Sequence, residues 1–273
     1  MSADGIRRCA VVGSPINHSL SPLLHRAAYA ALGLDWTYER FEVPAAGLAD
    51  FVARLDPSWR GLSLTMPLKE AVLELGEVDP VARLAGAGNT LILGGRRQVY
   101  NTDVAGLAWA VRRVTADPVP RVTILGSGAT ARSAVVALTS LAAEAVTVVA
   151  RTPARAESLA GLGSELGLRM RVQPWGSALP PADLVLSSAT AGAVDSMAAE
   201  VAASAPVVFD IVYAPWPTQL AQAAAEAGRT VIGGLDLLVG QALGQIELMT
   251  GQSVPPEVLY AALPESRGSL AGT

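Results

Sequence analysis

The stretch "VTILGSGATA" at residues 122–131 decides the fold of this chain. A short β-branched run leads directly into Gly126 and Gly128, and a helical segment follows with Ala131 in the third small position. Glycines at these points let the backbone turn tightly and approach a pyrophosphate, which the N-terminus of the following helix stabilises. Because the pattern lies between an expected strand and an expected helix, it predicts a dinucleotide-binding, Rossmann-like domain.

The end of the next expected strand indicates which dinucleotide binds. NAD sites place a carboxylate there for the ribose 2′-hydroxyl. The segment "TVVARTPARA" at 147–156 instead supplies Arg151, Thr152 and Arg155. Two cations and a hydroxyl suit a 2′-phosphate, which a carboxylate would repel. We therefore predict NADP as the cofactor, with two solvated arginines at the start of a helix as the alternative.

Short β-branched runs alternate with Ala/Leu-rich helical segments along the whole chain, which is typical of βα units and a mainly parallel sheet. A length of 273 residues is sufficient for two domains. We predict an α/β protein in which residues 1–104 and 237–273 form a substrate-binding catalytic domain with an open twisted sheet. Residues 105–236 would form the NADP-binding Rossmann-like domain, and the C-terminal helices would return to the first domain.

Composition narrows the classes of partner. A net charge of -4 and a sequence pI of about 5.3 argue against a nucleic-acid or anionic-membrane surface, so small molecules are the expected partners. The single Cys9 excludes an internal disulfide, and no segment has the length of a membrane span. His18 and His25 lack further ligands at metal-binding spacing, so no metal site is expected. We expect a cytoplasmic monomer or homodimer.

The segment "GLSLTMPLKE" at 61–70 contains Lys69. Thr65 as a cap and Pro67 as the first helical residue predict a helix start, which would place Lys69 in the first turn. A helix N-terminus disfavours a cation by about 0.3–1 kcal/mol. Lys69 is then either a solvated surface residue or a functional amine. Asp103, in "NTDVAG" at 101–106, has a similar alternative as the N-cap of the helix that follows.

With the cofactor site defined, the chain resembles the shikimate dehydrogenase family in motifs that follow one another in order. The matching pieces are "GSPINHSLSPLLH" (13–25), "GLSLTMPLK" (61–69), "GAGNT" (86–90), "NTDVAG" (101–106), "LGSGATARS" (125–133), "RTPARA" (151–156), "DIVYAPWPT" (210–218) and "GLDLLVGQA" (234–242). The resemblance implies the reversible, NADPH-dependent reduction of 3-dehydroshikimate to shikimate in the shikimate pathway of aromatic amino acid biosynthesis.

The resemblance also implies roles for single residues. Lys69 and Asp103 match the catalytic pair, with Lys69 as general acid/base and Asp103 orienting it. The positions that match substrate-binding residues are Ser19 and Ser21 for the carboxylate, Thr65, Asn89 and Gln241 for the ring hydroxyls, and Tyr213 near the carboxylate. The expected cofactor contacts are Gly126, Ser127, Gly128, Ala129, Thr130, Ala131, Arg151, Thr152, Arg155, Ile211 and Gly234.

Four departures from the family's common residues and two other functions stay open. Ser63, Ala150 and Ser188 stand where the family often has Asn, and Leu237 stands where it often has Met. A quinate or amino-shikimate dehydrogenase of the same family is one alternative. A non-catalytic sensor of shikimate-like acids or of dinucleotide is another. The presence of both Lys69 and Asp103, and the absence of a basic DNA-binding segment, argue against the sensor.

Overall fold

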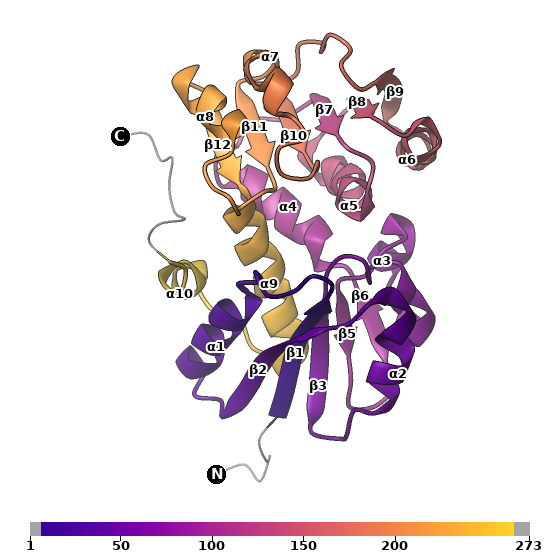
Figure 1. The fold of residues 1–273 in the computed structure, drawn as a ribbon, viewed down its shortest axis with the longest axis vertical. Coiled ribbons are helices and arrows are strands. Elements are labelled where there is room, and N and C mark those ends of the chain that lie inside the picture. Colours follow the sequence, from indigo (N-terminus) through magenta and orange to yellow (C-terminus); the bar gives the residue numbers. More distant parts are fainter. Residues whose placement is uncertain (1–6, 265–273) are drawn as a thin grey trace. The chain divides into compact units, whose positions relative to one another are not determined.

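A computed structural model describes residues 7–264 and divides the chain into two compact units (Figure 1). The first unit comprises the described residues up to Gly106 together with Leu238–Leu263, and the second comprises Leu107–Leu237 and Pro264. The chain changes units inside α4 (Thr102–Arg112) and inside α9 (Gly234–Thr250). The predicted first domain also included residues 1–6 and 265–273, which lie outside the described residues.

The first unit is built on a mixed sheet of six strands in the order β2-β1-β3-β5-β6-β4. The first three strands pair in parallel, whereas β5 runs antiparallel to both of its neighbours. The strands are β1 (Arg7–Gly13), β2 (Trp36–Glu42), β3 (Trp59–Leu64), β4 (Glu77–Val78), β5 (Thr90–Ile92) and β6 (Gln98–Tyr100). The other elements are α1 (Ser21–Ala31), η1 (Ala45–Gly47), α2 (Leu48–Ala53), η2 (Ala71–Leu75), α3 (Pro80–Ala85) and α10 (Pro256–Ala261).

Alternation along β1 divides the core of this unit between the two faces of its sheet. Ala10 and Val12 belong to a cluster with residues of α2, while Cys9 and Val11 pack with Tyr29 of α1 and Met249 of α9. Successive residues of a strand point to opposite faces, so α2 covers one face and α1 with α9 the other. The last helix, α10, packs on α1, which confirms that the C-terminal helices return to the first unit.

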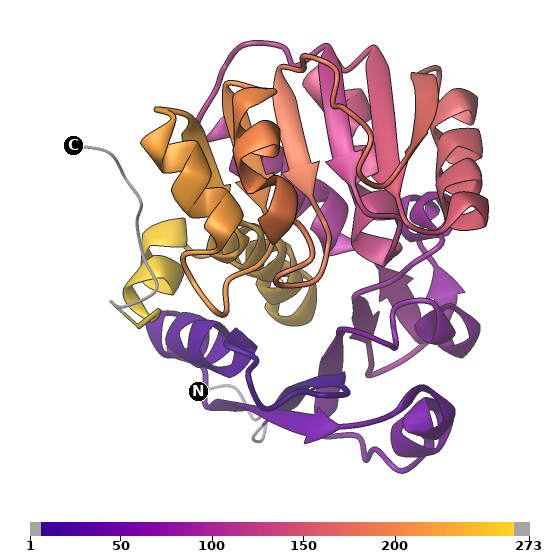
Figure 2. The same ribbon diagram turned by 45° about the horizontal axis from the view of Figure 1, so that its top comes forward.

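The second unit is a parallel sheet in the order β12-β11-β10-β7-β8-β9, with helices in front of and behind it in Figure 2. The chain goes outward from β7 in one direction and then returns to build the other half, so β7 is the switch point where such sheets bind nucleotides. The strands are β7 (Arg121–Leu125), β8 (Ala145–Ala150), β9 (Arg169–Pro174), β10 (Leu184–Ser187), β11 (Val207–Asp210) and β12 (Thr230–Gly233).

The helical elements of this unit are α5 (Ala129–Leu138), η3 (Thr139–Leu141), α6 (Pro153–Glu165), η4 (Asp195–Met197), α7 (Ala198–Ala203) and α8 (Gln219–Glu226). The predicted Rossmann-like fold is confirmed. Within residues 7–264, no helix is both long and apolar enough to cross a membrane.

Two local predictions are wrong. Residues 65–70 form turns, and the 3₁₀ helix η2 begins only at Ala71, so Lys69 does not lie in the first turn of an α-helix. The reason is a long-range bond, because the Lys69 carbonyl accepts the Gly88 N–H at 2.7 Å rather than a donor of its own segment. Asp103 does not cap α4 either. The helix begins at Thr102, and the Asn101 Oδ1 accepts the Val104 N–H at 3.2 Å.

His25 of α1 is a buried titratable group in the first unit. Its ring is stacked on Tyr38, with the ring centroids 4.0 Å apart, and its Nε2 lies 3.2 Å from the Gln245 Oε1. Burial lowers the pKa of His25 to about 3, against the smaller opposing effect of the Gln245 hydrogen bond. The folded protein therefore keeps this ring neutral.

This burial predicts an acid-sensitive stability. Below the ordinary histidine pKa of about 6.5 the unfolded chain takes up a proton that the folded protein does not, so unfolding becomes easier as the pH falls. We expect His25 to contribute a loss of about 1.4 kcal/mol in unfolding free energy per pH unit below about pH 6. Urea unfolding at several pH values measures it.

His25→Asn should remove this part of the pH dependence. Tyr29→Phe, a change in the same cluster that alters no group titrating in this range, should keep it. If the wild-type protein and His25→Asn showed the same slope of stability against pH, the buried neutral ring would be the wrong explanation.

Candidate active site

Lys69 and Asp103 form a largely buried ion pair in the first unit. The Lys69 Nζ donates to the Asp103 Oδ2 at 2.6 Å, and the side chains are 16% and 5% exposed. An ion pair so far removed from water is favourable only when further hydrogen bonds satisfy its remaining atoms. The Asn89 Nδ2 supplies one by donating to the Asp103 Oδ1 at 2.9 Å. Each carboxylate oxygen therefore has a donor. Asp103 accepts a hydrogen bond from only one of the three N–H groups of the Lys69 ammonium.

Lys69 is also the only lysine in the sequence, among 20 lysine and arginine residues. Arginine stays protonated in proteins, whereas lysine can release its proton when its surroundings favour that. The other 19 of these residues are all arginine. The one side-chain amine of the chain is thus hydrogen-bonded to a buried carboxylate. This signal was available in the sequence and was missed by motif reasoning.

Gln241 joins the same group from α9. Its Oε1 lies 3.4 Å from the Asn89 Nδ2, and its Nε2 donates to the Leu238 carbonyl at 2.7 Å. The contact requires a close approach of α4, because a Cβ on Gly106 would lie 2.6 Å from the Gln241 backbone nitrogen. Four of the predicted residues, Lys69, Asn89, Asp103 and Gln241, are therefore brought together.

The other predicted substrate residues have separate positions. Ser19 and Ser21 are buried at the start of α1, where the Ser21 N–H lies 3.4 Å from the Ser19 Oγ. Thr65 follows β3, and its N–H donates to the Val12 carbonyl at 3.0 Å. Tyr213 lies half-buried in the second unit after β11. The binding roles of these four residues stay predictions.

The glycine-rich loop after β7 has the geometry of a phosphate site. Gly126 has a φ of +112°, which favours glycine, and a Cβ there would lie 2.5 Å from the Ser188 Oγ. The Ser188 hydroxyl donates to the Leu125 carbonyl at 3.0 Å. Ser188, which stands where the family often has Asn, therefore holds the residue that precedes the loop. No side chain caps α5 at Gly128, which leaves N–H groups of its first turn for an anion.

The predicted 2′-phosphate residues follow the neighbouring strand, β8. Arg151, Thr152 and Arg155 are all exposed, and α6 begins directly after Thr152 with no side-chain cap. The Arg151 guanidinium lies 5.8 Å from the centroid of the Trp175 ring. The exposed cations suit a phosphate dianion.

Ile211 and Gly234 are tightly packed against each other. A Cβ on Gly234 would lie 2.1 Å from the Ile211 carbonyl oxygen, so only glycine fits at the start of α9.

Asp210, which sequence reasoning missed, anchors the loop that follows β11. Its carboxylate accepts the Thr218 hydroxyl at 2.7 Å and the Val212 N–H at 3.2 Å. Burial raises the pKa of Asp210 above its ordinary value.

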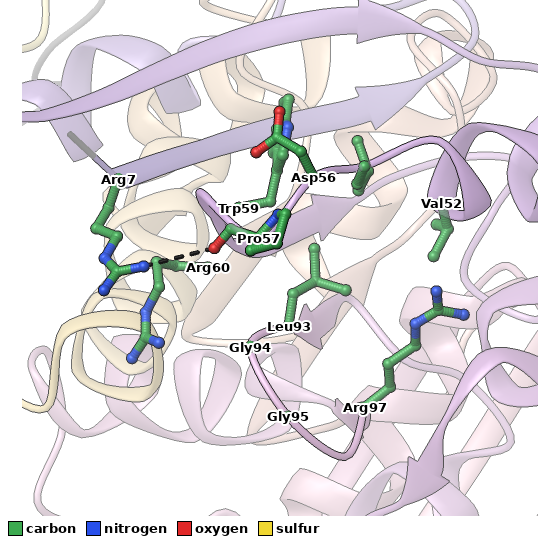
Figure 3. A pocket seen from close by; sticks show the side chains of 11 residues that line it. Arg7, Val52, Asp56, Pro57, Trp59, Arg60, Leu93, Gly94, Gly95 and Arg97 are labelled. Carbon is green, nitrogen blue, oxygen red and sulfur yellow. Dashed lines mark hydrogen bonds between the residues drawn. The ribbon is translucent and has the colours of Figure 1, made fainter. Parts of the chain in front are cut away.

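A hollow of about 520 Å³ lies elsewhere in the first unit, by the starts of β1 and β3, and contains none of the predicted site residues (Figure 3). Arg7, Arg60 and Arg97 line it around Trp59, and the Arg7 Nη1 donates to the Pro57 carbonyl at 3.4 Å. Over the described part of the chain, no group of three or more His, Cys, Asp or Glu side chains could hold a metal ion.

Comparison with known proteins gives matches over both units. Residues 11–91 match the family described as shikimate dehydrogenase substrate binding domain, and residues 112–213 match shikimate / quinate 5-dehydrogenase. The shikimate dehydrogenase (NADP(+)) of Moorella thermoacetica is 35% identical over 278 residues, which cover 96% of this chain and 94% of that protein.

Solved structures extend the likeness to three dimensions. The Mycobacterium tuberculosis shikimate dehydrogenase is 40% identical with a TM-score of 0.87, covering 94% of this chain and 98% of that chain. The shikimate 5-dehydrogenase of Thermus thermophilus, solved with NADP(H) and shikimate, is 32% identical with a TM-score of 0.81, and the coverage is again 94% and 98%.

The packing at Gly234 predicts a strong effect of adding one methyl group. Gly234→Ala places a Cβ against the Ile211 carbonyl, so we expect a loss of about 1–3 kcal/mol in unfolding free energy and weaker NADP binding. Gly161→Ala in α6 is the matched control, because its added Cβ meets nothing within 4 Å, and it should stabilise the protein slightly. Thermal unfolding measures both variants, and equal stabilities would contradict the prediction.

Proposed function

The chain belongs to the shikimate dehydrogenase family, and from that premise we propose that Lys69 and Asp103 carry out proton transfer in the NADPH-dependent reduction of 3-dehydroshikimate to shikimate. The observation that carries the proposal is the 2.6 Å bond between the Lys69 Nζ and the Asp103 Oδ2, in a setting where Asn89 occupies the other carboxylate oxygen. We propose further that the first unit binds the substrate and the second binds NADP.

The loop at 126–131 would hold the pyrophosphate of NADP, and Arg151, Thr152 and Arg155 would hold its 2′-phosphate. The φ of Gly126, the uncapped start of α5 and the exposed cations after β8 all fit such a ligand. NADPH bound by these residues would supply the hydride that reduces the substrate carbonyl carbon. Ile211 is proposed to contact the cofactor, and the Gly234 backbone is proposed to approach its nicotinamide.

Lys69 would complete the reduction as a general acid. The carbonyl oxygen becomes an alkoxide as its carbon is reduced, and a proton from the Lys69 ammonium to that oxygen yields the alcohol. In the reverse direction the neutral amine accepts the proton of the alcohol. Asp103 would hold the amine in place in both directions, since its own carboxylate is fixed by Asn89.

The remaining predicted residues would orient the ring. Ser19 and Ser21 are proposed to bind the substrate carboxylate, with Tyr213 near it. Thr65, Asn89 and Gln241 are proposed to bind the ring hydroxyls.

A quinate activity stays a second candidate, since the family matched by residues 112–213 is described by both substrates. That the chain acts in the cytoplasm as a monomer or homodimer stays a prediction from its sequence.

The proton-transfer role predicts that charge alone will not replace Lys69. Lys69→Arg keeps a cation but not a group that releases its proton, and Lys69→Met removes both. We expect kcat for shikimate oxidation to fall by about 10²–10⁴-fold in each, with a smaller change in KM. Steady-state kinetics by absorbance of the reduced nicotinamide measure this. Near-normal turnover by Lys69→Arg would indicate an electrostatic role instead.

The cofactor assignment predicts a loss that depends on the 2′-phosphate. Arg151→Ala should raise KM for NADP by about tenfold or more and leave KM for NAD nearly unchanged, because only NADP carries that phosphate. Arg171→Ala, at another exposed arginine of the same unit, serves as the control and should alter neither. Equal effects of Arg151→Ala on both cofactors would remove Arg151 from the phosphate site. Offering quinate in place of shikimate in the same assays tests the second candidate.

A further inference from the structure

Gln245 of α9 is a buried glutamine whose amide is bonded at both ends. It is 1% exposed, and its Nε2 donates to the Asn89 carbonyl at 3.0 Å and to the Thr90 Oγ1 at 3.2 Å. Its Oε1 accepts the Ser63 hydroxyl at 2.8 Å and lies 3.2 Å from the His25 Nε2. The Asn89 carbonyl can only accept, so it fixes the nitrogen of the amide toward itself and leaves the oxygen toward Ser63 and His25.

The sheet explains how one glutamine reaches two strands. Ser63 of β3 and Thr90 of β5 are directly opposite each other in the antiparallel pair, so their side chains share a face. The Tyr38 hydroxyl donates to the Ser63 Oγ at 2.6 Å, which commits the Ser63 proton to Gln245. At this position, where the family often has Asn, the Ser63 hydroxyl is therefore hydrogen-bonded inside the protein.

Thr90 links the Gln245 amide to the side chain of Asn89 and so determines how the Asn89 amide is oriented. A hydroxyl has one proton, and the Thr90 Oγ1, which accepts from Gln245, donates that proton to the Asn89 Oδ1 at 2.9 Å. The same Oδ1 accepts the Thr102 N–H at 2.8 Å. With its oxygen held by two donors, the Asn89 amide must direct its NH₂ group to the Asp103 carboxylate. A flipped amide would bring two oxygens together.

We propose that Gln245 and Thr90 are positioning residues that hold the Asn89 amide with its NH₂ group toward Asp103, and so keep the other carboxylate oxygen for Lys69. The proposal rests on the proposed function of Lys69 and Asp103. Neither Gln245 nor Thr90 was among the residues expected from the sequence, and each acts on the ion pair through Asn89.

Thr90→Val tests the proposal because it removes the hydroxyl with little change in shape. We expect kcat for shikimate oxidation to fall about tenfold, the size expected for one lost hydrogen bond, while KM for NADP is unchanged. Thr90→Ser restores the hydroxyl and should restore kcat to within about twofold of wild type. Thr123→Val is the matched control, since Thr123 is a buried strand residue whose hydroxyl meets no partner among the described residues.

A merely structural role would give a different pattern. If Thr90→Val lost thermal stability but kept kcat, or if Thr90→Ser lost as much kcat as Thr90→Val, the proposal would be overturned. Should Thr90→Val fail to fold, Gln245→Met takes its place. It removes the donor to Thr90 while keeping a long side chain, and it should lower kcat several-fold with KM for NADP unchanged. An unchanged kcat in Gln245→Met would likewise overturn the proposal.

The wild-type protein and Lys69→Arg, assayed alongside, separate this inference from the proposed function. Turnover by the wild type, with kcat lower by about 10²-fold or more in Lys69→Arg, supports the proposed function, whatever Thr90→Val does. Wild-type turnover that Thr90→Val matches contradicts the positioning role alone. Absence of turnover in the wild type with shikimate and NADP contradicts the proposed function itself and, with it, the inference that rests on it.

Discussion

The buried carboxylate of Asp103 is the constraint on which the first unit depends. An ionised carboxylate removed from water is costly unless donors meet its oxygens. Lys69 meets one oxygen and Asn89 the other. Asn89 is held in turn by a backbone N–H at the start of α4 and by a hydroxyl of β5. The turn after β3, the start of β5, the first turn of α4 and Gln241 of α9 are thus arranged around one negative charge. In the proposed reaction, that charge holds the amine from which the proton moves.

Arginine and lysine have different proposed roles in this chain. The expected phosphate contacts in the second unit use arginine, whose charge is permanent and whose planar group matches phosphate oxygens. The proposed proton-transfer position uses the only lysine of the chain. A fixed charge is useful where a dianion has to be bound, and a removable proton is useful where an alkoxide has to be protonated. The choice between Lys and Arg, usually a minor variation on a surface, therefore follows the proposed function of each site.

The sequence was sufficient to predict those parts of the fold that depend on residues close together in the chain. The glycines after β7, the cations after β8 and the alternating pattern predicted the Rossmann-like unit, because each depends on neighbours within a few residues. Prediction was wrong at residues 65–70, where the Lys69 carbonyl is bonded to Gly88 rather than within its own segment. Asn101, rather than Asp103, caps α4, a distinction that depends on where the helix begins. Gln245 could not be found from local pattern at all, since its partners Asn89 and Thr90 lie more than 150 residues away in the sequence.

Chemical rescue of Lys69→Ala by small primary amines tests the central claim, that Lys69 moves a proton and Asp103 holds the group that does so. The cavity left by the truncated side chain offers an added amine the Asp103 carboxylate as its partner. The account predicts that ethylamine restores shikimate oxidation with a rate that rises with amine concentration, and that guanidinium at equal concentration does not. Equal restoration by guanidinium, which brings the charge but retains its proton, would contradict proton transfer by Lys69.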